Sequence, residues 1–280
     1  MSIGEAFGTL GEMFSYGWMQ RALIVGTLVS LCAALLGVML VLRRVSMIGD
    51  GLSHVGFGAM AAALAIGAAP LPFAVPLVIA AAFLLIRLSR SERVGGDAAV
   101  AVAASSSLAI GLIIVSLGPG MNADVSSYMY GSVLAMNSQD VVLSLTLSAA
   151  VLGLYLFSYN RLFAITFDEG FATATGVRSG LYGTLVAVLT AVTVVVGMRM
   201  MGALLISSLV VFPPLAAMRV CRSFRGVTVW SGVIAVSCFL VGISASCLCG
   251  TPVGASVVAA DLVALLLCTA VGRAVRGSKR

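Results

Sequence analysis

The chain has 280 residues, of which 61% are apolar and only 9% are charged. A soluble domain averages about 25% charged residues, so this composition cannot cover a globular surface with polar groups, and a cytosolic enzyme is excluded. A membrane-spanning helix uses about 20 apolar residues, which leaves room for eight or nine spans with short connections. The sequence predicts an all-α, polytopic bundle of transmembrane helices that forms a single domain over residues 1–280.

The first 17 residues are expected to form an amphipathic helix that lies in the membrane interface. Glu5 and Glu12 precede the first arginine, so the basic segment of a cleavable signal peptide is missing. Four apolar side chains at spacings of four, three and four share the face opposite these glutamates, namely Ile3, Phe7, Leu10 and Phe14. Trp18 then suits an aromatic anchor at the interface.

Nine apolar runs between helix-breaking residues are the candidate spans, with ends uncertain by several residues. They cover 19–42, 52–69, 71–88, 98–117, 140–158, 181–198, 202–218, 227–249 and 254–272. The stretch 119–139 is longer and semi-polar, and short or re-entrant helices are expected in it.

If the nine spans alternate in direction, 14 of the 16 basic residues fall on one side of the membrane. By the positive-inside rule this side is cytoplasmic, and it includes the C-terminal tail. Only Arg21 and Arg199 disagree. The net charge of +6 is explained by this topology, so it gives no reason to expect a nucleic-acid partner. The expected partner of the surface is the lipid bilayer.

Rare residue types exclude several kinds of chemistry. Lys279 is the only lysine and no glycine directly precedes it, so the chain has no Walker A phosphate-binding loop and does not hydrolyse ATP itself. His54 is the only histidine, which excludes a zinc site made of histidines alone. We therefore expect no catalytic residues and no permanently bound cofactor.

Asp50 and His54 are four residues apart, so on a helix both side chains project from one face. A carboxylate and an imidazole suit Zn²⁺ or Mn²⁺, although two ligands are too few for a metal cage. Two copies of the chain related by a twofold axis would supply four. The alternative is structural: Asp50 would cap the second span and His54 would hydrogen-bond to it.

Asp261 is the other acid of interest, because it lies deep in the last expected span with no basic residue near it in sequence. Charged groups inside a membrane are costly and are usually paired or functional. Asp261 could face a wet pathway and act as a further metal ligand. A polar contact between helices is an equally good explanation.

The segment 159–180 is the only cytoplasmic stretch long enough to dock a partner. Within it, Asp168 and Glu169 suit the first turn of a short helix and Gly176 suits its C-terminal end. Phe167 and Phe171 would share one face of this helix. That apolar pair could form a partner surface or could lie against the membrane interface.

Three motifs together resemble the permease subunits of bacterial zinc/manganese ABC importers. The first is the arginine, Gly-Asp and Ser-His signature after the first span, here Arg43-Arg44 through Gly49-Asp50 to Ser53-His54. The second is the coupling segment from Phe167 to Val177. The third runs from Val196-Gly197 through Gly202 to Pro213-Pro214, and is followed by Pro252 and Gly254-Ala255. The resemblance covers about residues 20–265, in the expected order.

This resemblance implies a homodimeric permease in the bacterial cytoplasmic membrane. It also implies a cytosolic ATP-binding subunit that docks on each coupling segment, and an extracytoplasmic protein that delivers the metal. The family's aspartate and histidine are implicated in metal passage and match Asp50 and His54. The coupling residues would be Phe167, Asp168, Glu169, Phe171 and Gly176. The cargo would be Zn²⁺ first, or Mn²⁺.

Two positions depart from the family pattern. Glu169-Gly170 stands where a proline followed by an acidic residue is common, and Asp261 stands in a span that is usually apolar. A glycine inside a helix costs up to about 1 kcal/mol, so the coupling helix could be looser here. The alternative function is a secondary, proton-coupled metal transporter or exchanger that uses Asp50 and Asp261 as relay groups.

Overall fold

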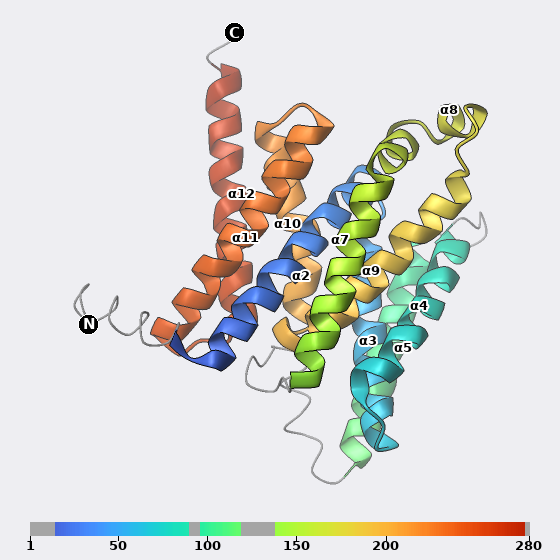
Figure 1. The fold of residues 1–280 in the computed structure, drawn as a ribbon, viewed down its shortest axis with the longest axis vertical. Helices are drawn as coiled ribbons and strands as arrows, with labels where there is room; N and C mark the ends of the chain where they lie inside the picture. Colours follow the sequence, from blue (N-terminus) through green and yellow to red (C-terminus); the bar gives the residue numbers. More distant parts are fainter. Residues whose placement is uncertain (1–14, 90–95, 119–137, 278–280) are drawn as a thin grey trace.

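The structure is a computed structural model that describes residues 15–89, 96–118 and 138–277. All regular secondary structure within these ranges is helical (Figure 1). The helices are α2 (Gly17–Leu42), α3 (Met47–Ala65), α4 (Pro70–Ser89), α5 (Gly96–Leu117), α7 (Ser138–Phe167), α8 (Glu169–Ala174), α9 (Ser179–Met201), α10 (Ala203–Val220), α11 (Phe224–Cys249) and α12 (Val253–Gly277).

The all-α prediction is confirmed, and each of the nine expected spans coincides with one long helix. Eight of these helices are long and apolar enough to cross a membrane. The exception is α3, which carries Asp50, Ser53 and His54. Two predicted segments fall almost entirely outside the described residues: the interfacial helix over 1–17 and the irregular stretch over 119–139.

Several helix ends differ from the prediction by four residues or more, and two of these bear on the candidate site. The second span was expected to begin at residue 52, but α3 begins at Met47, so Asp50 lies inside the first helical turn. The fifth span was expected to end at residue 158, but α7 continues to Phe167. The first nine residues of the expected coupling segment 159–180 are therefore the last turns of α7, and only α8 forms a separate helix.

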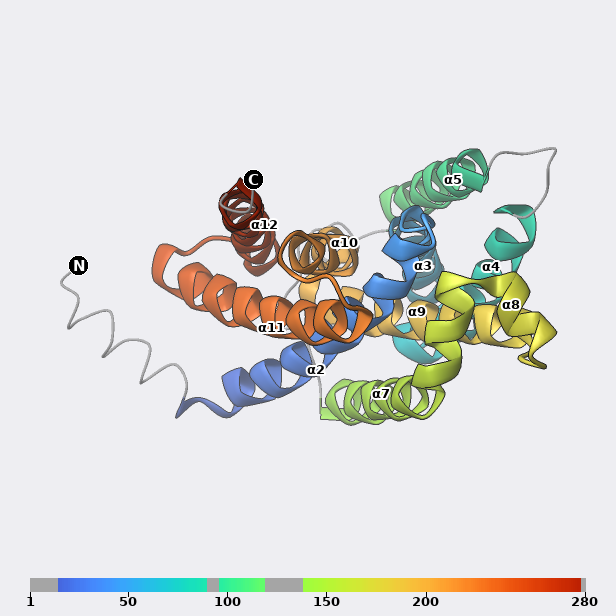
Figure 2. The ribbon, with the colours of Figure 1, turned by 90° about the horizontal axis from the view of Figure 1, so that it is seen from above.

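The helices form an inner and an outer set. In their most apolar stretches, α2 and α9 have 72% of their residues buried, whereas α12 has 17%. The inner helices pack against most of the others, and α12 contacts mainly α10 and α11. Seen from above, α12, α10, α3 and α5 lie along one side of the bundle, and α11, α2 and α7 lie along the other (Figure 2).

Small residues allow the inner helices to approach closely. A Cβ atom built on Gly37 of α2 would lie only 2.0 Å from the backbone oxygen of Val210 in α10. Gly202 joins α9 to α10 with φ 86° and ψ 158°, a backbone conformation that is essentially restricted to glycine. Because lipid gives helices no hydrophobic reason to associate, such close backbone contact is what holds a bundle like this together.

The basic residues gather at one end of the bundle. The α2–α3 turn with Arg43 and Arg44, the helix α8 and the C-terminal end of α12 all lie there (Figure 1). Arg199, one of the two basic residues that disagree with this topology, lies in the last turn of α9 and forms a 2.9 Å ion pair with Asp140 in the first turn of α7. Its charge is balanced locally, so it carries little weight for orientation.

Candidate functional site

The polar residues of α3 follow directly from a tight reversal of the chain. Helix α2 ends at Leu42, and Arg44 adopts a positive φ of 58° that turns the backbone toward α3. The N-cap of α3 is Ser46, whose side chain makes no capping hydrogen bond. Since the helix starts at Met47, Asp50 is not its cap, and the capping alternative for this residue is wrong.

Glycines press α3 against three neighbouring helices. A Cβ on Gly51 would lie 2.5 Å from Val100 in α5, and one on Gly56 would lie 2.9 Å from Met198 in α9. A Cβ on Gly49 would lie 3.2 Å from Val210 in α10. The glycines of this motif thus allow helices of the same chain to pack closely on α3. These neighbouring helices bury most of the α3 surface.

One narrow stripe of α3 escapes this burial. Every residue from Ile48 to Ala63 is buried except four at a strict spacing of four, namely Asp50, His54, Gly58 and Ala62. Residues four apart lie one above another on a helix. The two candidate metal ligands therefore occupy the accessible face of this part of α3. Further along the same line, Gly58 packs closely against the Ser107 backbone in α5.

The two side chains are close but are not hydrogen-bonded. His54 Nε2 lies 3.8 Å from Asp50 Oδ2, beyond hydrogen-bond reach, and the side chains are 29% and 42% exposed. Two ligands of one zinc ion, each at about 2.1 Å, can be at most about 4.2 Å apart. The 3.8 Å separation is within this limit. In this structure His54 does not hydrogen-bond to Asp50, contrary to the structural alternative.

A single copy of this site is incomplete as a metal cage. Within the described ranges, no group of three or more His, Cys, Asp or Glu side chains is placed to hold a metal ion. Two protein ligands bind an ion weakly and leave its other positions open. Weak, open coordination suits an ion that passes through rather than one that stays.

The short helix α8 matches the predicted coupling helix closely. Asp168 is its N-cap and accepts a 2.8 Å hydrogen bond from the Phe171 backbone N–H. The helix ends at Ala174, and Gly176 follows with a positive φ of 89°, as a C-terminal glycine does. Gly170 does not prevent the helix from forming, because this cap fixes its start.

An ion pair that sequence reasoning missed joins α8 to the α2–α3 turn. Arg43 Nη2 donates a 2.6 Å hydrogen bond to Glu169 Oε2, across 126 residues of sequence. Arg43 directly follows α2 and stands seven residues before Asp50. The sequence placed each residue in a motif, but no local spacing relates the two. Only the return of α7 to the same end of the bundle brings them together.

Aromatic rings pack together at the end of α7, directly before α8. The Phe167 ring packs against those of Phe163, 4.9 Å away between centroids, and Phe224, 5.9 Å away. Phe167 is still 63% exposed and Phe171 is 67% exposed. The two phenylalanines thus present apolar surface at the basic end of the bundle. Phe163 and Phe224 were not singled out from the sequence, because they are ordinary apolar residues of long helices.

Asp261 lies apart from this site. It is 1% exposed within α12, and neither carboxylate oxygen has a hydrogen-bond partner among the described residues. Its nearest polar neighbours are Ser208 of α10 and Cys238 of α11, and the Ser208 hydroxyl already donates to the Leu205 backbone oxygen. The structure therefore does not bring Asp261 together with Asp50 and His54.

Comparison with known proteins gives a consistent result. The model of the ABC 3 transport family matches residues 15–272. The chain is 27% identical over 237 residues to the high-affinity zinc uptake system membrane protein ZnuB of Haemophilus influenzae, covering 85% of this chain and 91% of that protein. It is 26% identical over 247 residues to the manganese transport system membrane protein MntC of Halalkalibacterium halodurans, covering 88% and 85%.

A solved structure has the same fold. The structure described as PsaBC from Streptococcus pneumoniae in complex with Fab contains a chain that matches this one with a TM-score of 0.84. The two chains are 24% identical, and the match covers 95% of each. The likeness extends over the whole helical bundle.

Proposed function

The chain belongs to the ABC 3 transport family, and we propose that it is the permease of an importer that carries a divalent transition-metal ion into the cytoplasm. It is a multi-pass membrane protein and a transport subunit rather than an enzyme. The observation that carries the proposal is the accessible stripe of α3, because Asp50 and His54 are its only side chains able to bind a metal.

Zinc is the first candidate cargo and manganese the second. An imidazole and a carboxylate bind both ions, and the relatives named above include one zinc and one manganese system. With only two ligands per chain, we infer that selection between the metals depends largely on the extracytoplasmic protein that delivers the ion.

A second copy of the chain would complete the site. Helix α3 lies on the side of the bundle formed by α12, α10, α3 and α5 (Figure 2). A twofold axis along this side would bring together two Asp50 and two His54 side chains, which is enough for four-coordination. The metal pathway would then run between the two copies, past Asp50 and His54.

The ATP-binding subunit would act on this pathway through α8. Exposed Phe167 and Phe171 supply an apolar contact surface at the cytoplasmic end. When the two ATP-binding subunits close, they would displace α8, and the Arg43–Glu169 ion pair would pass that displacement to the turn that begins α3. This linkage would open the Asp50/His54 site first to the outside and then to the inside.

The proposed function can be tested by identifying the energy source that drives metal transport. The chain would be reconstituted in liposomes with and without its ATP-binding subunit, and Zn²⁺ or Mn²⁺ entry would be followed with an indicator. We expect accumulation only with the subunit, the delivery protein and ATP together. Equal accumulation without ATP, driven by a proton gradient, would contradict the importer and support the exchanger.

A further inference from the structure

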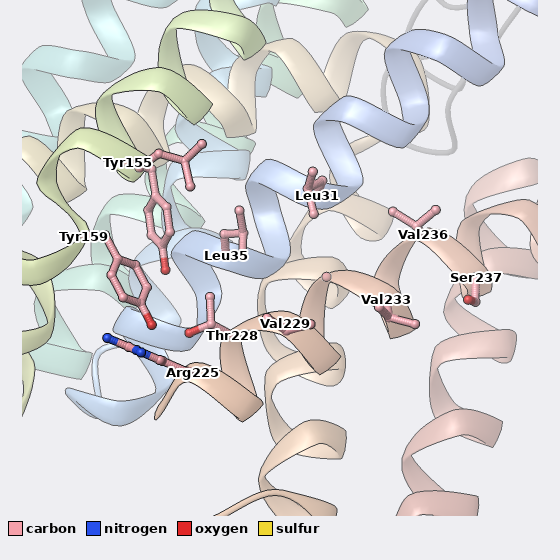
Figure 3. Close-up of a pocket in the computed structure, with 12 residues that line it drawn as sticks. Leu31, Leu35, Tyr155, Tyr159, Arg225, Thr228, Val229, Val233, Val236 and Ser237 are labelled. Atoms are coloured by element: carbon pink, nitrogen blue, oxygen red, sulfur yellow. The ribbon is translucent and has the colours of Figure 1, made fainter. Parts of the chain in front are cut away.

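A second feature of the molecule is a groove on the side opposite helix α3. It lies between α2, α7 and α11 and has a volume of about 690 Å³ (Figure 3). Leu31 and Leu35 of α2 form one wall, and Val229, Val233 and Val236 of α11 form the other. The groove is therefore lined by apolar side chains along most of its length.

The groove is open to the surroundings of the bundle. Leu156, Val229 and Val233 on its rim are 67%, 63% and 48% exposed. All three belong to membrane-spanning helices, so the solvent they face is lipid. Arg225 and Ser237 mark its ends on α11 and are separated by about 18 Å along the helix, which is a little more than half of a 30 Å hydrocarbon layer. The groove thus has the length of one leaflet.

Most polar groups of the groove lie at one end, and Ser237 lies at the other. Figure 3 shows the Arg225 guanidinium beside the Tyr159 hydroxyl, with the Thr228 hydroxyl next to them. Arg225 lies in the first turn of α11, where the helix dipole favours anions, and it has no ion pair among the described residues. This end is the cytoplasmic end, because Phe224 packs on Phe167 just before α8.

One wall of the groove also holds an unsatisfied polar atom. Tyr155 is 1% exposed, and its hydroxyl has the Thr228 hydroxyl as a neighbour. The Thr228 hydroxyl donates to the Phe224 backbone oxygen, and among the described residues no hydrogen bond of normal geometry reaches the Tyr155 hydroxyl. An isolated buried hydroxyl costs free energy unless another group pairs with it. The Tyr155 ring stands between the apolar walls and the Arg225 end (Figure 3), where the ester region of a lipid would lie.

We propose that this groove binds an anionic phospholipid of the cytoplasmic leaflet. One acyl chain lies along Leu31, Leu35 and Val233, and the phosphate accepts hydrogen bonds from Arg225 and Tyr159. A positive charge at one end of an apolar slot fits this occupant, whose anionic phosphate and apolar acyl chain match the two parts of the groove. The headgroup lies next to Phe224, so the bound lipid also steadies the aromatic contacts at the base of α8.

The test is native mass spectrometry of the full-length chain after removal of lipid, with phosphatidylglycerol and phosphatidylcholine added in turn. Wild-type protein should retain phosphatidylglycerol more strongly. Arg225→Gln removes the charge, and Val233→Trp fills the slot. Each should weaken phosphatidylglycerol retention about tenfold, the loss expected for a charge-assisted hydrogen bond or a blocked site. The matched control is Arg222→Gln, which alters the same basic turn but does not line the groove.

Four outcomes would overturn the proposal. Unchanged retention in Arg225→Gln is one, and an equal loss in Arg222→Gln is another, because a general surface charge would then explain the binding. The third is disulfide cross-linking between copies through Val233→Cys, which would show that a second copy covers the groove. Displacement of phosphatidylglycerol by inorganic phosphate at equal concentration would likewise contradict a site that needs the acyl chain.

Discussion

At the scale of single residues, the Arg43–Glu169 ion pair is the contact that relates the coupling helix to the metal site. The side chains are 22% and 41% exposed, so the pair adds little to folding stability, under about 1 kcal/mol. Its importance is its position: one partner begins α8, and the other precedes the turn into α3. We propose that a weak contact at such a point transmits movement without holding the fold together.

We predict that Glu169→Gln uncouples ATP hydrolysis from transport. The reconstituted complex should hydrolyse ATP at a rate close to that of the wild type but move several-fold less metal per ATP, because α8 would no longer pull on Arg43. The measurement is the ratio of metal transported to phosphate released. The exchanged pair Arg43→Glu/Glu169→Arg serves as the control and should recover part of the ratio. An unchanged ratio in Glu169→Gln would show that the pair does not transmit the movement.

Some features of single residues could be predicted from the sequence alone, and others could not. Asp50 and His54 were predicted as site residues from their spacing and motif, and their metal role stays a prediction. The short helix α8 was predicted from the acidic residues at its start and the glycine after its end, although Asp168 is its N-cap rather than part of its first turn. The ion pairs Arg43–Glu169 and Asp140–Arg199 were not predicted, because their partners are 126 and 59 residues apart and belong to different helices. Nothing local in the sequence constrains such contacts.

At the scale of helices, packing through glycine decides which elements sit inside. Gly37 is the sharpest case, since a Cβ there would meet the Val210 backbone oxygen at 2.0 Å, and a backbone atom cannot rotate away. Gly153 lies within α7 with no atom inside 4 Å of the same position. The two glycines offer a matched pair for testing helix packing.

We predict that Gly37→Ala destabilises the protein and that Gly153→Ala does not. Overpacking at Gly37 should cost about 1–3 kcal/mol, because α2 and α10 must separate. At Gly153 the better helix propensity of alanine should leave stability equal or up to about 1 kcal/mol higher. Thermal unfolding in detergent should show a midpoint lowered by roughly 3 °C or more only in Gly37→Ala. Equal midpoints in the two variants would contradict the close α2–α10 approach.

Helix existence was predictable from the sequence, whereas several helix ends, including two that bear on the candidate site, were not. Apolar runs of about 20 residues located all nine long helices. The start of α3 was missed because Gly49 and Gly51 flank Asp50 and weaken the helical pattern, yet their lack of side chains is what allows α3 to pack. The end of α7 was missed because Asn160 and Arg161 interrupt the apolar run, while Phe163 and Phe167 pack on Phe224 and continue the helix.

At the scale of the whole molecule, the two sides of the bundle have different roles in this account. The side with α12, α10, α3 and α5 includes the helix of the candidate metal ligands and would meet a second copy (Figure 2). The side with α2, α7 and α11 carries the lipid groove. One end gathers the basic residues, α8 and the exposed phenylalanines, so the ATP-binding subunit would dock there. The chain thus separates cargo, lipid and energy input onto three surfaces.

The central claim is that the metal passes along the α3 stripe, and metal accumulation by the reconstituted complex tests it most directly. Wild type would be compared with the near-isosteric variant Asp50→Asn/His54→Gln and with Asp97→Asn, a control that removes an exposed carboxylate from the first turn of α5. The account predicts that Asp50→Asn/His54→Gln assembles with its ATPase but loses nearly all Zn²⁺ and Mn²⁺ uptake, while Asp97→Asn keeps it. Wild-type uptake by Asp50→Asn/His54→Gln would contradict the claim and move the pathway away from α3.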